Sequence, residues 1–380
     1  MNIYAKQILM DGALVADKTV CIEDGIITAI LDGRVAPDKE VAYLAPGLVD
    51  LHCHGGEGFN ARDREIDGIA PFLEKMQASG VTDFLMTVST GRKELMQHGV
   101  RLTKKAMEWQ ACGRLGGARI RGVHLEGPFL SLKSAGAMQK SAMQAPSVAV
   151  FEDFFGEDID VIREVTLAPE EAGADALIDY LVSKGIHVQA GHTAATFDEA
   201  TAGFSRGITS LCHSFNGCRG IHHREPGVVV AALEGERISM EAICDLVHLH
   251  PAIIKLIYQM KGPQKTVVIS DSTITNGLPN GEYHVEGYDI VVKDGISRTF
   301  DGALDGGGAY LDRSVRNLVS IGIPAEDALT MASTTPAARV GLSDVGEIVL
   351  GMRAHLVAFN EQLHPVMVVI DNDVKCYEGC

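Results

Sequence analysis

Short apolar runs alternate with stretches of helical period through most of the chain, from residue 48 to residue 345. Short apolar runs bounded by turn residues predict buried strands, and apolar residues that recur every three or four positions predict amphipathic helices. The predicted strands cover residues 48–53, 81–87, 121–125, 162–167, 187–190, 210–214, 238–244 and 267–270. The clearest predicted helices cover residues 69–79, 174–184, 197–206, 250–260, 309–321 and 325–335.

This alternation indicates an α/β fold with parallel strands joined by helices. Eight such units in roughly 300 residues predict a (β/α)8 barrel of the TIM type. A doubly wound open sheet is the alternative. The chain has neither a G-x-G-x-x-G segment after the first strand nor a G-x-x-x-x-G-K-[ST] segment, which disfavours the nucleotide-binding versions of that sheet.

Both ends of the chain have a different pattern of short strand-like runs, and near the N-terminus Asp-Gly turns at 11–12, 24–25 and 32–33 accompany these runs. Near the N-terminus these runs cover residues 3–9, 20–23 and 26–31, and near the C-terminus they cover residues 347–349, 354–359 and 366–370. We therefore expect residues 1–47 and 346–380 to form a small β-sandwich domain together, and residues 48–345 to form the barrel.

The charge of the chain limits its partners. It has 33 Lys and Arg against 50 Asp and Glu, a formal charge of −17, and basic residues do not cluster, so nucleic acid is not expected as a partner. An anionic ligand would need a local basic pocket. We expect no membrane association, because no apolar run reaches ~18 residues. The eight cysteines form no C-x-x-C pair and no secretory signal is apparent, so we expect a cytoplasmic protein with free thiols.

Two histidines one residue apart end the first predicted strand, in Asp50-Leu51-His52-Cys53-His54-Gly55. Residues i and i+2 of a strand point to the same side, so His52 and His54 can direct two imidazoles at one point. Imidazole is the commonest metal ligand near neutral pH. A polar pocket filled by two histidines would explain this pair equally well.

Further histidines and acids follow the other predicted strands: Glu126 after the third, His192 after the fifth, His213 after the sixth, Asp245 and His248 after the seventh, and Asp271 after the eighth. Each residue alone fits a hydrogen-bonded core histidine or a loop-anchoring carboxylate. In a barrel, however, the carboxyl ends of all strands meet on one face, where active sites are built. Imidazoles with carboxylates favour a catalytic divalent ion such as zinc, iron or manganese.

The order of these motifs resembles the N-acetylglucosamine-6-phosphate deacetylases of the amidohydrolase superfamily, over essentially the whole chain. The matching motifs are His-x-His at 52–54, His-Leu-Glu-Gly-Pro-Phe at 124–129, Ala-Gly-His-Thr at 190–193, His-Ser-Phe-Asn-Gly at 213–217, His-His-Arg-Glu-Pro-Gly at 222–227, Ile-Cys-Asp-Leu-Val-His at 243–248 and Ile-Ser-Asp at 269–271. The fourth strand ends in Thr-Leu-Ala-Pro at 166–169 and offers no lysine for carboxylation, unlike dihydroorotase-like enzymes.

The resemblance implies roles for individual residues. Glu126, His192 and His213 would bind the principal metal ion, and His52 and His54 would hold a second ion with Glu126 bridging, so one or two ions per chain are expected. The ion would be zinc, with iron, manganese and cobalt as alternatives. Asp271 would be the catalytic acid and base. The residues implied in substrate binding are Ala137, Asn216, Gly217, Arg224, Asp245, His248, Leu304, Asp305 and Gly306. Arg224 would bind the sugar phosphate, in a homodimer across the subunit interface.

The implied reaction is hydrolysis of the acetamide of a small phosphorylated amino sugar, N-acetylglucosamine 6-phosphate, in amino-sugar catabolism. One departure is Met138, where many relatives have a histidine that polarises the carbonyl group. The alternatives are therefore N-acetylgalactosamine 6-phosphate or another N-acyl amino sugar, or a deaminase or cyclic amidase of the same superfamily. A metal-binding scaffold without turnover is disfavoured, because such a protein has no use for Asp271.

Overall fold

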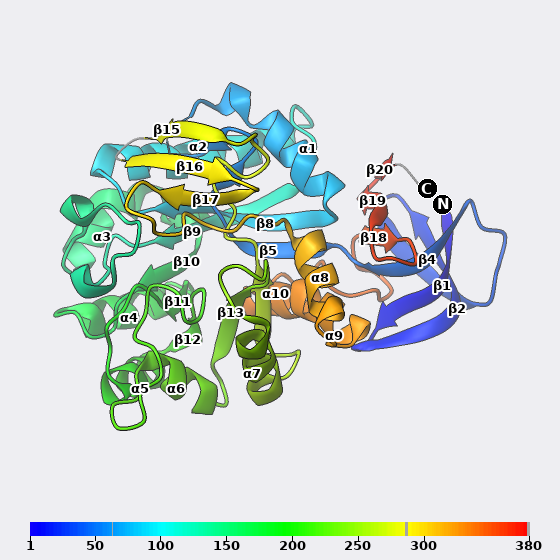
Figure 1. Ribbon diagram of the computed structural model, residues 1–380. Coiled ribbons are helices and arrows are strands. Elements are labelled where there is room, and N and C mark those ends of the chain that lie inside the picture. Colours follow the sequence, from blue (N-terminus) through cyan, green and yellow to red (C-terminus); the bar gives the residue numbers. More distant parts are fainter. Residues whose placement is uncertain (63, 286–287, 378–380) are drawn as a thin grey trace.

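The computed structural model describes residues 1–62, 64–285 and 288–377, and a parallel barrel with a smaller β-domain beside it makes up the molecule (Figure 1). The barrel strands are β5 (Leu48–Cys53), β8 (Val81–Ser89), β9 (Arg119–Glu126), β10 (Ile162–Leu167), β11 (His187–Ala190), β12 (Ile208–Leu211), β13 (Ser239–Ile243) and β14 (Thr266–Ile269). They lie side by side in chain order, and every pair is parallel. The predicted (β/α)8 barrel is thus confirmed, and the open sheet is excluded.

Hydrogen bonds just beyond β14 join the last strand to the first. The amide of Asp271 donates to the carbonyl of His52 at 2.9 Å, and the amide of His54 donates to the carbonyl of Ser272 at 2.8 Å. The barrel therefore closes at the end where the chemically interesting residues of both strands lie.

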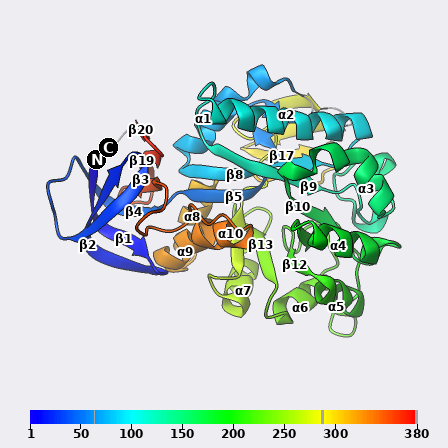
Figure 2. The ribbon, with the colours of Figure 1, turned by 180° about the vertical axis from the view of Figure 1, so that it is seen from behind.

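Helices surround the strands on the outside of the barrel (Figure 2). Their bounds are α1 (Ala70–Ala78), α2 (Lys93–Ala111), α3 (Val148–Phe155), α4 (Ala174–Ser183), α5 (Phe197–Arg206), α6 (Val228–Glu234), α7 (Pro251–Lys261), α8 (Leu311–Ser320), α9 (Ala325–Ala332) and α10 (Thr334–Arg339). A capping box between Thr196 and Glu199 starts α5. The single helix predicted over 325–335 is wrong: Ser333, with φ −134° and ψ −76°, separates α9 from α10.

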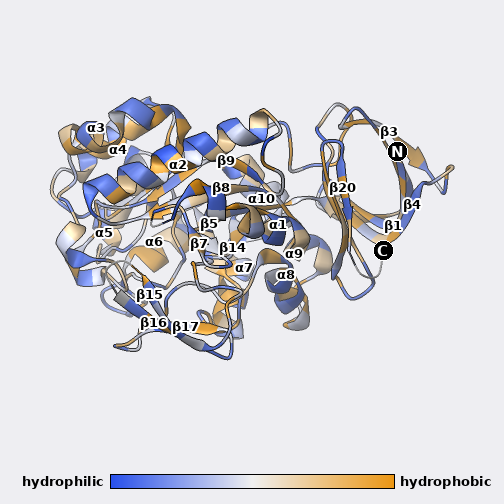
Figure 3. Cartoon of the chain, turned by 90° about the horizontal axis from the view of Figure 1, so that it is seen from above, coloured by the Kyte–Doolittle hydropathy of each residue, from blue (hydrophilic) through white to orange (hydrophobic). Residues whose placement is uncertain are grey.

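The core lies between the strands and these helices. β5, β13 and β14 are buried along their whole lengths, as strands covered on both faces should be. Hydrophobic and hydrophilic residues alternate along α2 in Figure 3, and Met96, Val100 and Ala106 are among the residues that this helix buries. Within the described part of the chain, no helix is both long and apolar enough to cross a membrane.

Both chain ends contribute to the small domain, as predicted. One seven-stranded sheet contains, in spatial order, β20 (Asp373–Cys376), β19 (Pro365–Ile370), β18 (His355–Phe359), β4 (Lys39–Pro46), β1 (Asn2–Met10), β2 (Ala13–Glu23) and β3 (Ile26–Asp32). β18 pairs with β4, so the C-terminal strands continue the N-terminal sheet. These strands share their own apolar core, and Figure 1 shows β1 and β20 in this same domain. The predicted strand at 347–349 is wrong, because these residues form a loop. The division at residues 47 and 346 stays a prediction.

One insertion escaped the sequence analysis. Between β14 and α8 the chain forms a separate antiparallel sheet of β15 (Gly281–Val285), β16 (Tyr288–Lys293) and β17 (Ile296–Thr299). A short hairpin of β6 (Gly55–Gly56) and β7 (Phe59–Asn60) follows β5. The remaining helical turns are the 3-10 helices η1 (Ile66–Gly68), η2 (Leu132–Ser134), η3 (Lys140–Ala142) and η4 (Gly156–Val161).

Candidate metal centre and active site

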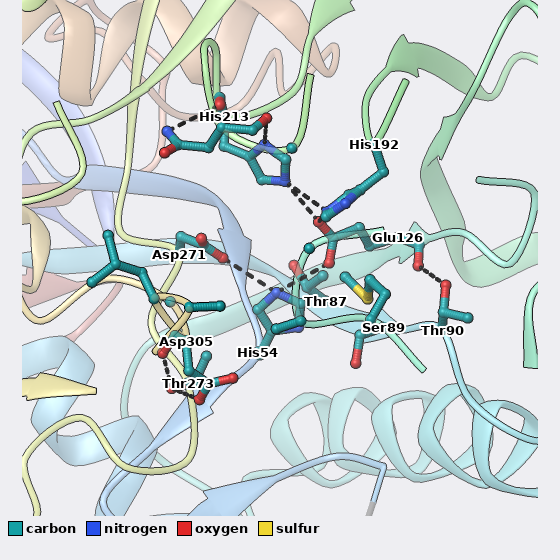
Figure 4. Close-up of a pocket in the computed structure, with 18 of the residues that line it drawn as sticks. His54, Thr87, Ser89, Thr90, Glu126, His192, His213, Asp271, Thr273 and Asp305 are labelled. Carbon is teal, nitrogen blue, oxygen red and sulfur yellow. Dashed lines mark hydrogen bonds and ion pairs between the residues drawn. The ribbon is translucent and has the colours of Figure 1, made fainter. Parts of the chain in front are cut away.

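Side chains from the carboxyl ends of five barrel strands converge at one point, where His54, Glu126, His192, His213 and Asp271 point toward one another (Figure 4). His52, which is fully buried, completes the cluster, and its Nε2 lies 3.6 Å from Glu126 Oε1. Glu126 Oε1 lies 2.9 Å from His213 Nε2 and 3.1 Å from His192 Nε2. Asp271 Oδ1 lies 3.3 Å from His54 Nε2 and 3.4 Å from His52 Nε2. All six residues are at most partly exposed. The structure thus brings together every residue predicted to bind metal.

The spacing of these atoms fits a divalent ion. Ligands of a tetrahedral zinc ion, each roughly 2.0–2.1 Å from the metal, are separated by about 3.3 Å. Besides the distances above, His192 Nε2 and His213 Nε2 are 3.1 Å apart, and His52 Nε2 and His54 Nε2 are 3.2 Å apart. His52, His54 and Asp271 form one compact set of potential ligands. Two neighbouring sets of nitrogen and oxygen atoms therefore fit one or two ions.

The carboxylate of Glu126 lies between the two sets. Its Oε1 faces His192 and His213, whereas its Oε2 lies 3.4 Å from His54 Nε2. Oε2 is buried and takes part in no hydrogen bond with the residues that the structure describes. Burial of an oxygen without a hydrogen bond is costly, and a bound cation would remove that cost. This orientation suits a bridging carboxylate.

Backbone strain holds three of these side chains in place. His192, His213 and Asp271 have positive φ values of 45°, 23° and 49°, which non-glycine residues rarely adopt and which often occur at functional sites. The loop after β17 approaches Asp271 closely, because a Cβ on Gly306 would lie 2.5 Å from the Asp271 carbonyl oxygen. The glycines at 306–308 therefore allow close packing against the end of β14.

Backbone carbonyls fix the orientation of two of the imidazoles. His192 Nδ1 lies 3.0 Å from the carbonyl oxygen of Ser134, and His213 Nδ1 lies 3.2 Å from that of Asn216. A carbonyl accepts a hydrogen bond, so Nδ1 of each ring carries the proton and donates it. The lone pair of Nε2 is then free to face Glu126, as metal binding requires.

Charges in the cluster keep both acids ionised. Burial raises the pKa of Asp271, but His52 and His54 outweigh it, and the net pKa lies below the usual range for an aspartate. Burial likewise raises the pKa of Glu126, and His52, His192 and His213 together bring it well below its usual range. The carboxylate of Asp271 lines the cavity beside these histidines, where it can accept a proton.

The cluster forms the floor of a cavity with a volume of about 320 Å³, within the size range of small-molecule sites. Seven of the residues predicted to bind substrate line it: Ala137, Asn216, Gly217, His248, Leu304, Asp305 and Gly306. His54, Glu126, His192, His213 and Asp271 also line it, and so does Met138.

Three predicted site residues do not line the cavity. His52 is fully buried beneath it. Asp245 lies behind His248, where its Oδ2 is 2.8 Å from His248 Nδ1 and its Oδ1 accepts the His248 amide at 2.9 Å. Arg224 is exposed on the loop after β12, where its guanidinium contacts His223. Asp245 thus positions His248, and Arg224 does not belong to the cavity wall of its own chain.

The sequence also marks residues 273–276 as an atypical lining segment, and Thr273 and Ile274 do line the cavity. Several other lining residues were missed by sequence reasoning: Asn60, Arg62, Thr87, Ser89, Thr90, Gly136, Gln139 and Ala303. Arg62 is the arginine of the cavity wall among the described residues, and its Nη1 donates to Ser89 Oγ at 3.2 Å and to the Thr90 carbonyl at 3.0 Å. The sequence signal that could have identified Arg62 is its position in the loop just after the strand that ends in His-x-His.

Comparison with known proteins gives a family match over most of the chain. The model of the amidohydrolase family matches residues 43–376. An N-acetylgalactosamine-6-phosphate deacetylase of Escherichia coli O157:H7 is 31% identical, over 98% of both chains. An N-acetylglucosamine-6-phosphate deacetylase of Vibrio furnissii is 33% identical, over 94% of this chain and 88% of that protein.

Solved structures agree with these sequence relatives. A mutant N-acetyl-D-glucosamine-6-phosphate deacetylase from Mycobacterium smegmatis, in complex with N-acetyl-D-glucosamine-6-phosphate, superposes with a TM-score of 0.91 at 31% identity, over 98% of each chain. The N-acetylglucosamine-6-phosphate deacetylase from Thermotoga maritima superposes with a TM-score of 0.89 at 29% identity, over 98% of this chain and 99% of that one.

Proposed function

The chain belongs to the amidohydrolase family, and from this premise we propose that it is a metal-dependent deacetylase that converts N-acetylglucosamine 6-phosphate into glucosamine 6-phosphate and acetate. The observation that carries the proposal is geometric: the carboxylate of Asp271 lies 3.3 Å from His54 and 3.4 Å from His52, within a cluster of potential metal ligands that lines a cavity of substrate size. The relatives named N-acetylglucosamine-6-phosphate deacetylase support the same reaction, because the similarity covers 88% or more of each of them.

Glu126, His192 and His213 would hold the principal ion, and His52 and His54 a second one, with zinc as the first choice. A divalent ion in such a site lowers the pKa of water and polarises a carbonyl group. The protein's own residues orient the acetamide against this centre, exclude bulk water and move the proton.

Asp271 performs the proton transfers in this proposal. Hydrolysis adds the oxygen of water to the acetamide carbon, breaks the bond between carbon and nitrogen, and leaves one proton to reach the departing nitrogen. Asp271 accepts the proton that water loses and donates it to that nitrogen, so that the sugar leaves as an amine. Its Oδ1 is 3.3 Å from His54 Nε2, at the edge of the cluster, and its carboxylate lines the cavity.

The phosphate group of such a substrate needs a cationic partner inside a strongly acidic protein. Arg62 supplies a guanidinium on the cavity wall, and guanidinium groups suit phosphate oxygens in both charge and geometry. Arg224 is exposed and does not line the cavity of its own chain, and we therefore propose a homodimer in which it reaches the cavity of the other subunit. A cytoplasmic location fits a phosphorylated intermediate of sugar catabolism and is proposed with it.

The galacto epimer is the second candidate substrate. The E. coli relative that carries this name covers 98% of both chains at 31% identity. In addition, Met138 lines the cavity, and its thioether cannot donate the hydrogen bond that a histidine would give to a carbonyl oxygen. Thr273 and Asp305, also in the cavity wall, are polar groups that can distinguish hydroxyl epimers.

A panel of four sugars tests the proposal with the purified zinc-loaded protein: N-acetylglucosamine 6-phosphate, N-acetylgalactosamine 6-phosphate and the two unphosphorylated sugars. Acetate release should be fastest with the phosphorylated glucosamine. A preference for the galacto epimer would keep the reaction and change the substrate. Release of ammonia, or acetate release without any dependence on phosphate, would overturn the proposal.

A further inference from the structure

A buried carboxylate lies directly beneath the metal cluster and contacts two of its members. Glu241, on β13, has its Oε2 3.3 Å from His52 Nδ1, and the same oxygen accepts the backbone amide of His213 at 3.2 Å. The Glu241 side chain is completely buried. It belongs to neither the cavity wall nor any motif that the sequence analysis singled out.

Arg339 holds this carboxylate from the far side. Arg339 ends α10, and its Nη2 donates to Glu241 Oε1 at 2.8 Å. The same nitrogen lies 2.6 Å from both oxygens of Glu164, on β10. Glu164 is completely buried and Arg339 nearly so. One guanidinium therefore contacts two carboxylates, and only Glu241 reaches onward to the metal cluster.

Two N–H groups, from the Arg339 side chain and the His213 backbone, donate hydrogen bonds to the Glu241 carboxylate, and such donors favour its ionised form. Burial raises its pKa, but Arg339 and His52 outweigh this effect, and the net pKa falls well below the usual range for a glutamate. Burial raises the pKa of Glu164 to about 7, even though Arg339 lowers it. Of the two partners of Arg339, Glu241 is the one that also contacts His52 and His213.

An ionised carboxylate at Nδ1 determines which nitrogen of His52 can bind metal. Because Glu241 only accepts hydrogen bonds, the proton lies on Nδ1, and the lone pair of Nε2 faces His54, Glu126 and Asp271. Cys212 Sγ is also 3.5 Å from Nδ1, but a thiol is a much weaker acceptor than a carboxylate.

We propose that Glu241, held by Arg339, is a positioning residue that orients His52 and raises its basicity as a metal ligand. His192 and His213 receive only neutral carbonyl oxygens at Nδ1, so His52 is set apart by a charged partner. Carboxylate partners of this kind increase the affinity of histidine for metal ions. This inference rests on the proposed metal centre and is independent of which sugar is the substrate.

The test compares Glu241→Gln with the matched control Glu164→Gln in the full-length protein. Each change removes one carboxylate from Arg339, but only the first disturbs His52. The amide introduced by Glu241→Gln cannot satisfy both neighbours: if its oxygen faces His52, its NH2 group meets Arg339, and the flipped amide presents NH2 to His52. Competition with a chelator should show zinc binding weakened about 10- to 100-fold in Glu241→Gln and close to wild type in Glu164→Gln.

A spectroscopic measurement separates positioning from general destabilisation. The visible absorption of the cobalt-loaded protein should change in Glu241→Gln and stay as in wild type in Glu164→Gln, because the spectrum reports on the ligands themselves. Equal zinc affinities and equal spectra in the two variants would overturn the inference. A wild-type protein that binds no divalent ion would instead overturn the proposed metal centre.

Glu241→Asp keeps the experiment decisive if the glutamine variant does not fold. It retains the negative charge for Arg339 but withdraws the carboxylate from His52 by one methylene group. Zinc binding should again be weaker than in Glu164→Gln. An aspartate variant with the zinc affinity of wild type would contradict a positioning role for this carboxylate.

Discussion

The backbone amide of Asp271 donates a hydrogen bond to the carbonyl of His52 at 2.9 Å, and this bond lies where the barrel closes. The side chains of the same two residues meet in the cluster, with Asp271 Oδ1 3.4 Å from His52 Nε2. The proposed acid and base is thus fixed to a proposed ligand by main chain as well as side chain. Geometry of this kind is set before substrate arrives, as efficient proton transfer requires.

Replacement of Asp271 by asparagine should abolish most of the turnover while the metal content stays near that of wild type. The amide has nearly the same shape but cannot accept the proton of water, and general acid–base catalysis is worth roughly 10²- to 10⁴-fold in rate. Steady-state kinetics and metal analysis on the same sample check this prediction. Activity close to wild type would remove Asp271 from its proposed role.

Replacement of Glu126 by glutamine should also abolish activity. In contrast to the Asp271 variant, however, this variant should lose its metal. Both oxygens of Glu126 face histidines of the cluster, and a neutral amide would remove the charge between the two proposed ion sites. Metal content per chain after dialysis provides the measurement. If the variant retained its full complement of metal, Glu126 would not be a shared ligand.

The effects of Arg62→Ala and Arg224→Ala on KM should show which arginine binds the phosphate group of the substrate. Arg62 lines the cavity, so its loss should raise KM for the phosphorylated sugar by roughly 10-fold or more, the size expected for a charged hydrogen bond. KM for the unphosphorylated sugar should change little. Arg224→Ala should raise KM selectively for the phosphorylated sugar only if the protein is a dimer. Sedimentation of the same samples would establish the oligomeric state. Equal effects on both sugars would exclude either arginine from phosphate binding.

Stability should fall between about pH 6.5 and pH 9 because of His355, which joins the small domain to the barrel. Its Nδ1 lies 2.7 Å from Asp83 Oδ2, on β8, and its Nε2 lies 3.2 Å from Asp371 Oδ1. Burial lowers the pKa of His355, but Asp83 and Asp371 outweigh it and raise the pKa to about 9. A histidine in the unfolded chain titrates near pH ~6.5.

The sign follows from this difference. The stabilisation by charged His355 is complete below the unfolded pKa and is lost as pH rises through the folded pKa, at a cost on the order of 3 kcal/mol. Urea unfolding at pH 6 and pH 9.5 measures it, with His355→Gln as the control that should lack this dependence. If the free energy of unfolding of the wild-type protein depended on pH no more than that of His355→Gln, His355 would not be the group responsible.

The regular part of the fold was predictable because local signals and tertiary structure agree there. The predicted strands 48–53, 162–167 and 187–190 and the predicted helix 197–206 match β5, β10, β11 and α5 residue for residue. These segments are bounded by turn or capping residues and are buried as their patterns require. The sheet of β15–β17 was missed because the described side chains of β15 are half-exposed or exposed, which leaves no continuous apolar run.

The candidate site was predictable where ligands occur in short motifs at strand ends. His52 and Glu241 are 189 positions apart, and their contact depends on the barrel bringing β5 and β13 to one centre, with Arg339 added from α10. No local spacing indicates such a contact. Arg62 was missed for a related reason, since a single basic residue in a loop acquires meaning only when the loop is folded over the cavity.

The most direct test of the account is acetate release from N-acetylglucosamine 6-phosphate by one preparation measured three times: as purified, after removal of metal with a chelator, and after reconstitution with zinc. Turnover should disappear when the metal is removed and return when zinc is added. Absence of acetate from the zinc-loaded protein, or turnover unchanged by the chelator despite complete loss of metal, would contradict it.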